Sequence, residues 1–222
     1  EEGRREIPEQ YKKYHLIIHF LGGLVIKDGD GIIQKIAWHS HKEKSILCYL
    51  IFHRKQSYHR DFLIELFWPD VHLDSGKGRL HPAISYLRAE LGKILSKEGI
   101  NLNPIILSEQ HYKFNDEISL WVDAEEFGHF AAKANLKTQD NKMIPSLLSA
   151  FQLYKGDFLP DIFDNWCEEK RNYYRELYLK VIKKLAVYYL SEKNYEKCKE
   201  MVNKVFSIDK LDTESHCLFM DY

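Results

Sequence analysis

SGKGRLHPAISYLRAEL, residues 75–91, is the stretch that constrains the fold most strongly. Its large apolar residues recur at steps of four, three and four positions: Leu80, Ile84, Leu87 and Leu91. A helix with 3.6 residues per turn places these positions on one face, which packs against a core. The spacing therefore predicts an amphipathic helix. The residue at which this helix begins is not determined by the pattern, because Pro82 either kinks the helix interior or lies in the first turn.

Two further helices are predicted before this one. The first spans about residues 41–54, and the second spans about residues 58–67 and is stopped by Pro69. Apolar residues at helical spacing are expected to face the core in both: Ile46, Leu47, Leu50 and Ile51, then Phe62, Leu63, Leu66 and Phe67. These helices supply the partners that the apolar face of residues 75–91 requires.

Short strands are predicted on either side of the three helices. Residues 14–36 alternate in the manner of strands and are interrupted by Gly22-Gly23 and by DGDG at 28–31, which predicts a small antiparallel sheet. Residues 105–107 and 112–114 are predicted to form a hairpin with SEQH, 108–111, at its tip. The order helix, turn, helix, hairpin is that of a winged helix, whose second helix of the pair enters a DNA groove.

Charge supports a local basic patch and not a basic protein. The net charge is −1, and residues 1–122 contain 17 Lys and Arg against 16 Asp and Glu. Residues 75–93, in contrast, carry a single acid, Glu90, against four cations: Lys77, Arg79, Arg88 and Lys93. Residues 53–60 carry three cations and no acid. The sequence therefore predicts a nucleic-acid contact that is confined to a patch.

The side of the predicted helix opposite its apolar stripe is the candidate DNA-reading face. At 100° per residue it carries Ser75, Gly78, Arg79, Pro82, Ser85, Tyr86, Ala89 and Lys93. Arginine can donate two hydrogen bonds to guanine, tyrosine can reach a phosphate, and Pro82 and Ala83 can contact a thymine methyl group. The alternative is a solvated helix face without a partner.

The pattern changes at Asp123. Asp123 and Glu126 have capping-box spacing and open a predicted helix with Phe127 and Phe130 inward. The remaining sequence is mainly helical, and residues 179–210 fit the 34-residue tetratricopeptide pattern, with small Ala186 and Cys198 where two helices cross. We expect a linker over 1–13, a winged-helix domain over 14–122 and a helical domain over 123–222.

The first domain resembles a known family. Trp68-Pro69-Asp70, followed by Leu80 and by Leu87-Arg88, resembles the winged-helix domain of SARP-type (antibiotic regulatory protein) bacterial transcriptional activators. These domains are related to the winged helices of response regulators. The acidic wing tip departs from the family, because Glu109 lies where a basic residue is often found.

The second domain resembles the module that follows the winged helix in the same regulators. LYKGDFLPD at 153–161, Asn165-Trp166 and EEKR at 168–171 are similar to the bacterial transcriptional activation domain, a tetratricopeptide-like helical module. Asp123 and Phe127 match the join between the two domains. The resemblance covers residues 14–222.

The resemblance implies both a fold class and a site. The fold class is an α+β winged helix, with a small antiparallel sheet, three helices and a wing hairpin, followed by an all-α tetratricopeptide-like domain. Arg79, Pro82, Ala83 and Tyr86 match groove-facing positions, and Arg88 matches a phosphate contact. Together with the neighbouring cations, the expected DNA-binding residues are Lys77, Arg79, Pro82, Ala83, Tyr86, Arg88 and Lys93.

Several classes of protein are disfavoured by the sequence. It contains no dinucleotide, phosphate-loop, zinc-protease or nucleophile-elbow motif, so we expect no enzyme activity, no cofactor and no metal site. Four dispersed cysteines without paired spacing indicate reduced thiols. We find no run of about 20 apolar residues and no signal peptide, so we expect a cytoplasmic protein without membrane contact. The missing initiator Met leads us to expect a fragment of a longer protein.

Two functions remain as alternatives. The first is a sequence-specific DNA-binding transcriptional activator that binds double-stranded promoter DNA and contacts RNA polymerase or a second copy through the helical domain. The second is an interaction module of a larger signalling protein whose winged helix does not read DNA. We also expect self-association through a C-terminal helix over 213–222, whose apolar residues are Leu218, Phe219 and Tyr222.

Overall fold

The computed structural model describes residues 13–133 and 143–209. The chain contacts divide into two compact units, the first comprising residues 1–18 and 24–121 and the second residues 19–23 and 122–222. The single boundary predicted at residue 122 did not foresee that residues 19–23 contact the second unit. The predicted linker 1–13, except residue 13, and the predicted helix 213–222 lie outside the described residues.

Two small sheets belong to the first unit. One has the order β3-β2-β1-β7, formed by Ile33–Gln34, Val25–Asp28, Leu16–His19 and Leu120–Val122. The other has the order β4-β6-β5, formed by Tyr58–His59, His111–Phe114 and Ile105–Ser108. The predicted strands are therefore present, and β4 adds a short strand where the start of a helix was expected.

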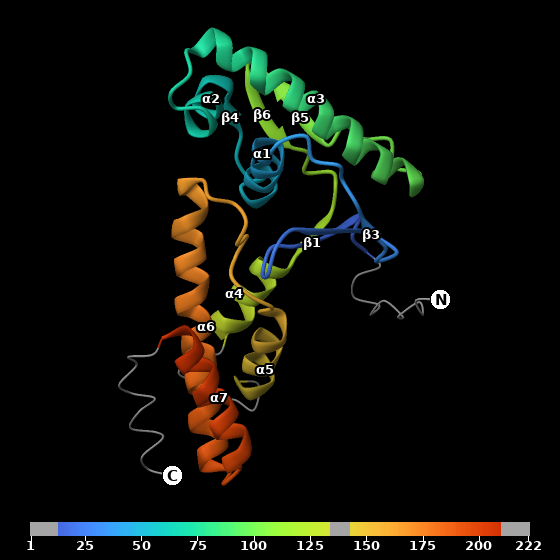
Figure 1. The fold of residues 1–222 in the computed structure, drawn as a ribbon. Helices are drawn as coiled ribbons and strands as arrows, with labels where there is room; N and C mark the ends of the chain where they lie inside the picture. The colour runs from blue at the N-terminus through green and yellow to red at the C-terminus, as the bar shows by residue number, and fades with distance from the viewer. Residues whose placement is uncertain (1–12, 134–142, 210–222) are drawn as a thin grey trace. The chain divides into compact units, whose positions relative to one another are not determined.

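Three helices form the core of the first unit: α1 (His41–Phe52), α2 (Arg60–Phe67) and α3 (Leu73–Lys97). Figure 1 shows α3 as a long green helix that runs along one side of this unit. The predicted apolar stripe of α3 is fully buried, as are the inward residues predicted for α1. In α2, Leu63 and Phe67 are buried as predicted. Phe62, also predicted to face the core, is 44% exposed, and Ile64 is buried instead.

Pro82 lies inside α3 and not in its first turn. The helix begins at Leu73, with the His72 side chain accepting a hydrogen bond from the Asp74 backbone N–H as its cap. Proline has no backbone N–H, so the Gly78 carbonyl receives no donor from Pro82. Both residues are on the exposed side of the helix, where water can satisfy that carbonyl.

The predicted wing is a tight hairpin. β5 and β6 pair with Ser108 opposite His111, which leaves Glu109 and Gln110 as a two-residue turn. Both turn residues have positive φ, 46° and 68°, as a type I′ turn requires. The turn geometry fixes the register of the wing, and with it the residues on each of its faces.

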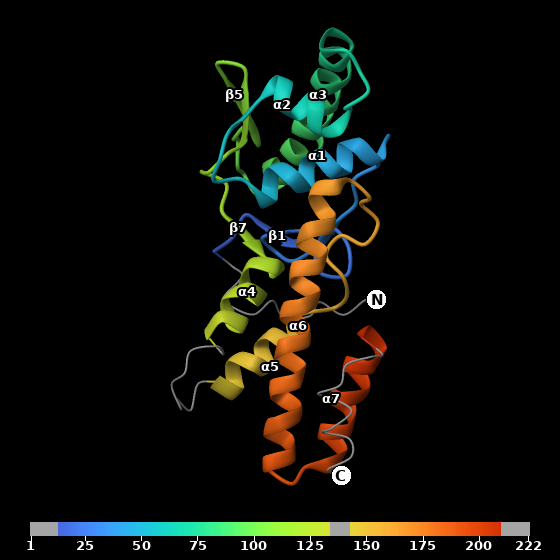
Figure 2. The same cartoon turned by 90° about the vertical axis from the view of Figure 1, so that its left-hand side faces the viewer.

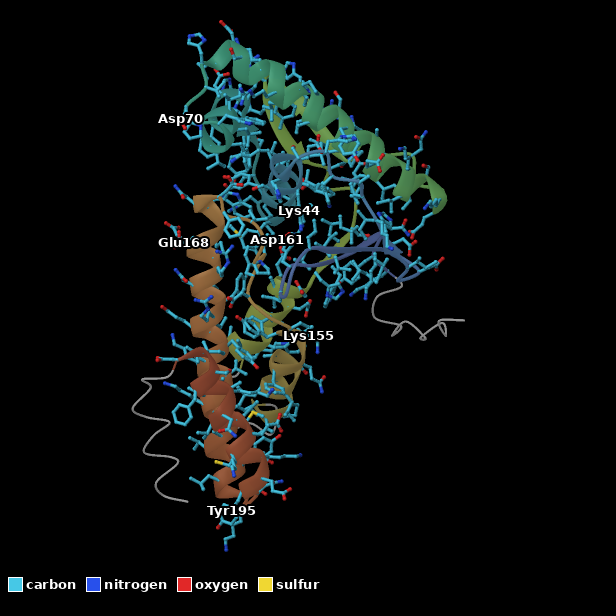
Figure 3. All side chains as sticks on the ribbon, viewed as in Figure 1. Lys44, Asp70, Lys155, Asp161, Glu168 and Tyr195 are labelled. Carbon is cyan, nitrogen blue, oxygen red and sulfur yellow. The ribbon has the colours of Figure 1, made fainter. Side chains whose placement is uncertain are left out.

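The second unit contains four helices in its described residues: α4 (Asp123–Lys133), α5 (Met143–Leu153), α6 (Asn165–Ser191) and α7 (Tyr195–Ile208). Figure 2 shows α7 alongside α6, with α5 on the other side of α6. The small residues Ala186 and Cys198 are buried, as expected for two closely packed helices. Tyr195, at the α6–α7 turn, projects outward in Figure 3. Helix α6 begins at Asn165, well before the start of the predicted repeat at 179.

Asp123 does not have the role of a capping-box residue. Its carboxylate accepts hydrogen bonds from the backbone N–H groups of Phe20, at 2.8 Å, and Leu21, at 3.1 Å. Its side chain is 1% exposed, and His19 Nδ1 lies 3.5 Å from the same carboxylate. Asp123 therefore attaches residues 19–23 to the start of α4, a long-range contact that local spacing does not reveal.

Candidate nucleic-acid interface

The close packing of α2 against α3 sets the direction of the candidate reading helix. Gly76 is buried in the first turns of α3, and a Cβ atom added to it would lie 2.1 Å from Ile64 Cγ2 of α2. Any side chain larger than hydrogen would force the helices apart. The connection between them is also ordered, because Trp68 N–H donates to the Ile64 carbonyl at 2.8 Å. Figure 3 places Asp70 in this connection.

The outer face of α3 is exposed, as predicted from the periodicity. We use "outer face" for Ser75, Gly78, Arg79, Pro82, Ser85, Ala89 and Lys93, all of which are exposed. Arg79 is central to this face, and none of the side chains in residues 13–133 and 143–209 forms a hydrogen bond or ion pair with it. Its guanidinium group is therefore available to a ligand.

Two other predicted cations on α3 have acidic partners on the same helix. Lys77 Nζ lies 2.8 Å from Asp74, and Lys93 forms an ion pair with Glu90. The hydrogen bond from Lys77 lowers the pKa of Asp74, and the hydrogen bond to Glu90 raises the pKa of Lys93. A phosphate would have to compete with the exposed carboxylate of Asp74 and the partly buried carboxylate of Glu90, and ion pairs at the surface are weak in water.

Three predicted contact residues face other parts of the first unit. Ala83 is 7% exposed and belongs to the core side of α3, which disfavours the expected contact with a thymine methyl group. Tyr86 donates its hydroxyl to the Ala37 carbonyl, and its ring packs on His39 at 4.2 Å between centroids. Arg88 Nε donates to the Ile105 carbonyl at 2.8 Å. These roles were missed because each partner is distant in sequence.

The wing presents acidic and apolar groups. Glu109 is exposed at the turn, and Ile106 and Leu107 of β5 are 39% and 48% exposed. Lys113 on β6 is paired with Asp116. This hairpin therefore lacks an unpaired lysine or arginine in its described strands and turn, in contrast to a wing that binds a phosphate backbone.

A histidine pair is the feature of the wing that sequence reasoning missed. His59 of β4 and His111 of β6 are directly opposite each other in the antiparallel pairing. Their ring centroids are 5.1 Å apart, with the rings inclined at 72°. The predicted hairpin contained His111, but residue 59 was assigned to a helix, so the cross-strand contact was not visible from the sequence.

The basic stretch 53–60 is partly used by the fold. Arg54 Nη1 donates to the Ile51 carbonyl at 3.3 Å, and Arg60 Nε is 3.0 Å from Asp61 Oδ1. Lys55 is exposed. The patch therefore has less free positive charge than its composition suggests.

The loop of residues 154–164, which carries most of the LYKGDFLPD motif, is held by two arginines of α6. Arg171 donates to three backbone carbonyls, those of Phe158, Leu159 and Ile162, at 3.1, 2.8 and 2.6 Å. Arg175 forms an ion pair with Asp157. Figure 3 shows Glu168, one turn earlier on α6, pointing away from the helix. The motif is thus explained by structure within the second unit.

The described residues offer little to other kinds of site. Within residues 13–133 and 143–209, no group of three or more His, Cys, Asp or Glu side chains is arranged to hold a metal ion. None of the helices in those ranges has the length and hydropathy needed to cross a bilayer. Burial raises the pKa of the Cys167 thiol to about 11, which disfavours the reactive thiolate.

The comparisons with known proteins find a similarity of structure and not of sequence. No family model matches the chain, and no curated protein sequence matches it. Mycobacterium tuberculosis EmbR, solved in complex with a low-affinity phosphopeptide, is similar with a TM-score of 0.54 and 17% sequence identity. The alignment covers 94% of this chain and 59% of the EmbR chain. The chain therefore shares the fold of the aligned part of EmbR.

Proposed function

We propose that the first unit binds double-stranded DNA with α3 in the major groove, and that the chain acts as a transcriptional regulator of the SARP type. The observation that carries the proposal is the division of α3 into a fully buried apolar stripe and an exposed outer face centred on Arg79. Helix α2, the connecting turn and the wing surround it in the order of a DNA-binding winged helix.

The residues on α3 have different roles in this proposal. Arg79 reads a base edge, because a free guanidinium can donate two parallel hydrogen bonds to guanine. Lys77 and Lys93 exchange their helical carboxylate partners for phosphates, which contribute affinity without sequence selectivity. Pro82 is exposed beside Arg79 and offers an apolar contact. Tyr86 and Arg88 act mainly as positioning residues, since each is bonded to a neighbouring backbone carbonyl.

The second unit would then act as the module that engages other proteins, RNA polymerase or a second copy of the chain. Support comes from the resemblance of its loop motif and from the similarity in fold to EmbR, which was solved in complex with a phosphopeptide.

Salt dependence tests the proposal. We would measure fluorescence anisotropy of labelled duplexes, using first a mixed sequence and then sequences selected from a random pool. Neutralisation of two to four phosphates predicts that the logarithm of the association constant falls with the logarithm of salt concentration with a slope of about −2 to −4. Arg79→Ala should weaken binding to the selected duplex more than binding to the mixed one. Absence of binding at low salt would exclude the proposal.

The alternative, an interaction module whose winged helix does not read DNA, has support from specific observations. The wing carries exposed Ile106, Leu107 and Glu109, and two α3 cations are already paired with acids. Under this alternative, Arg79→Ala and the native sequence would give the same anisotropy titration with every duplex. The same titrations therefore distinguish the two functions.

A further inference from the structure

We propose that the cross-strand histidine pair His59–His111 is a phosphate-binding site of the wing that takes up one proton when DNA binds. This inference rests on the proposed DNA-binding function and adds to it a second contact surface and a dependence on pH. It starts from an acidic wing tip, where a phosphate contact has to come from groups other than lysine and arginine.

The hydrogen bonds assign different tautomers to the two rings. His111 Nδ1 lies 2.9 Å from the Glu109 carbonyl oxygen and therefore carries a proton that it donates to this oxygen. Its Nε2 is then an acceptor in the neutral ring. His59 Nδ1 accepts a hydrogen bond from the Asp61 backbone N–H at 3.2 Å, which leaves the proton of the neutral ring on Nε2.

This difference makes His111 the ring that gains a proton. Protonation of His111 at Nε2 converts an acceptor into a donor and leaves its bond to Glu109 intact. Protonation of His59 would occur at Nδ1 and would remove its helix cap, so it has a structural cost. After one proton is taken up, both rings offer an Nε2–H donor, and the pair carries one positive charge.

The surroundings favour an anion beside the pair, whose rings contact each other, only after this protonation. Arg60 is the first residue of α2, and its backbone N–H donates to the Gln110 carbonyl at 2.8 Å, which joins the helix start to the wing turn. Its side chain is paired with Asp61, whose Oδ2 is 3.8 Å from His59 Nδ1. Other charged or titratable groups nearby are Glu109, Tyr112 and Lys113 of the wing and His72 and Asp74 at the start of α3.

Charge balance then sets the direction of the effect. With both histidines neutral, Asp61 and Glu109 oppose Arg60. Lys113 is paired with Asp116 and Asp74 with Lys77, so these two pairs lie outside this balance. A proton on His111 changes the local balance by one unit and supplies a charged donor for a phosphate. Because phosphate binding stabilises the protonated ring, DNA affinity should rise as pH falls through the histidine range, between pH 8 and pH 5.

The test combines a binding measurement with a direct readout of His111. The full 222-residue chain is titrated with a mixed duplex of about 30 base pairs at constant ionic strength over pH 5 to 8. For the native sequence, affinity should rise by about tenfold in total between pH 8 and pH 5 from this one proton. His111→Gln keeps an amide donor but cannot titrate, so it should lose this part of the pH dependence.

The matched control is His129→Gln, which removes an exposed histidine of α4 in the second unit and should leave the pH dependence unchanged. The first unit carries other exposed histidines, so NMR of the His111 ring provides the decisive measurement. Addition of the duplex should raise the pH at which the His111 ring is half protonated.

Each outcome has a definite meaning. If DNA binds but leaves the titration of His111 unchanged, or if His111→Gln keeps the full pH dependence, the histidine site is wrong while DNA binding stands. If no duplex binds at any pH at low salt, the proposed function itself is wrong. A circular dichroism spectrum equal to that of the native chain verifies that His111→Gln is folded.

Discussion

The outer face of α3 and the loop of residues 154–164 hold their arginines in different ways. Arg79 is exposed on α3 and has no polar partner among the described residues, whereas Arg171 donates to three carbonyls of the loop at 2.6–3.1 Å. Both residues belong to sequence motifs that resemble the same family of regulators. The comparison teaches that a matched arginine can be a ligand-binding residue in one unit and a structural residue in the other.

The two regions also differ in what positions them. Helix α3 is held in place by the burial of its apolar stripe and by the close approach of Gly76 to Ile64. The residues of its outer face are therefore not needed to hold the helix in place. The loop has Leu159 at a φ of 43°, which is uncommon for a residue with a Cβ atom, and it depends on polar contacts with α6. Substitutions in the loop should therefore change stability, and substitutions on the outer face should change binding.

The largest expected effect is on the loop. Arg171→Ala removes a charged donor from three partly buried carbonyls, which should lower the free energy of unfolding of the second unit by about 3 kcal/mol. Arg171→Lys should recover only a part of this loss, because an ammonium cannot reproduce the planar arrangement of donors. Urea denaturation followed by circular dichroism measures both. Lys180→Ala, an exposed change on the same helix, is the control. If Arg171→Ala and Lys180→Ala are equally stable, Arg171 does not hold the loop, and the structural role given to it is wrong.

The next effect concerns the packing of α2 on α3. Gly76→Ala introduces a Cβ that would lie 2.1 Å from Ile64 Cγ2, and we expect a loss of about 2 kcal/mol in the stability of the first unit. Gly78→Ala is the matched control, because no atom lies within 4 Å of its added Cβ. In a helix this control should stabilise by about 0.5–1 kcal/mol.

A rescue experiment sharpens this second prediction. Ile64→Ala removes the atoms that the new Cβ would meet, so the double variant should be more stable than the sum of the two single changes predicts. If the two stability changes are additive, α2 and α3 can move apart without cost. The close approach of Gly76 to Ile64 would then not position the outer face.

A third effect separates two arginines of α3. Arg79→Ala should cost about 1–3 kcal/mol of affinity for a selected duplex with a change in stability below about 0.5 kcal/mol. Arg88→Ala removes the hydrogen bond to the Ile105 carbonyl, so it should lower stability by about 1 kcal/mol and affect all duplexes alike. Thermal unfolding and anisotropy on the same samples measure the two quantities. If Arg88→Ala weakens binding to the selected duplex but not to other duplexes, Arg88 and not Arg79 would be the base-reading residue.

The smallest effect is the pH dependence of the Arg175–Asp157 pair. The hydrogen bond from Arg175 lowers the pKa of Asp157 below its ordinary value in the folded chain. The pair therefore contributes stability above the unfolded pKa of about 3.9, and this contribution is lost as pH falls through the lower folded pKa. Asp157→Asn should cost less than about 1 kcal/mol at pH 7, since the pair is partly exposed. The cost should disappear in acid unfolding measurements at pH values below the folded pKa of Asp157. A difference that persists in strong acid would show that packing, and not charge, is what Asp157 supplies.

The sequence alone determined the elements and their order. The apolar period of α3, the stop at Pro69 and the hairpin tip at 108–111 follow from local rules of periodicity, backbone sterics and turn geometry, and these rules act over a few residues. The exposed outer face, including Arg79, followed from the same period. The similarity in structure to EmbR agrees with the fold class that was predicted from separated motifs.

Only the tertiary structure decided which of the candidate residues are free. Tyr86 bonds to Ala37, Arg88 bonds to Ile105, and Asp123 bonds to Phe20, each across a long separation in sequence. Periodicity assigns a residue to a face, but it does not reveal which backbone carbonyl or N–H group folds back beside that residue. For Phe20 and Ile105 the physical reason is that a buried backbone group requires a partner, and a polar side chain that is close in space can supply it whatever its position in the sequence.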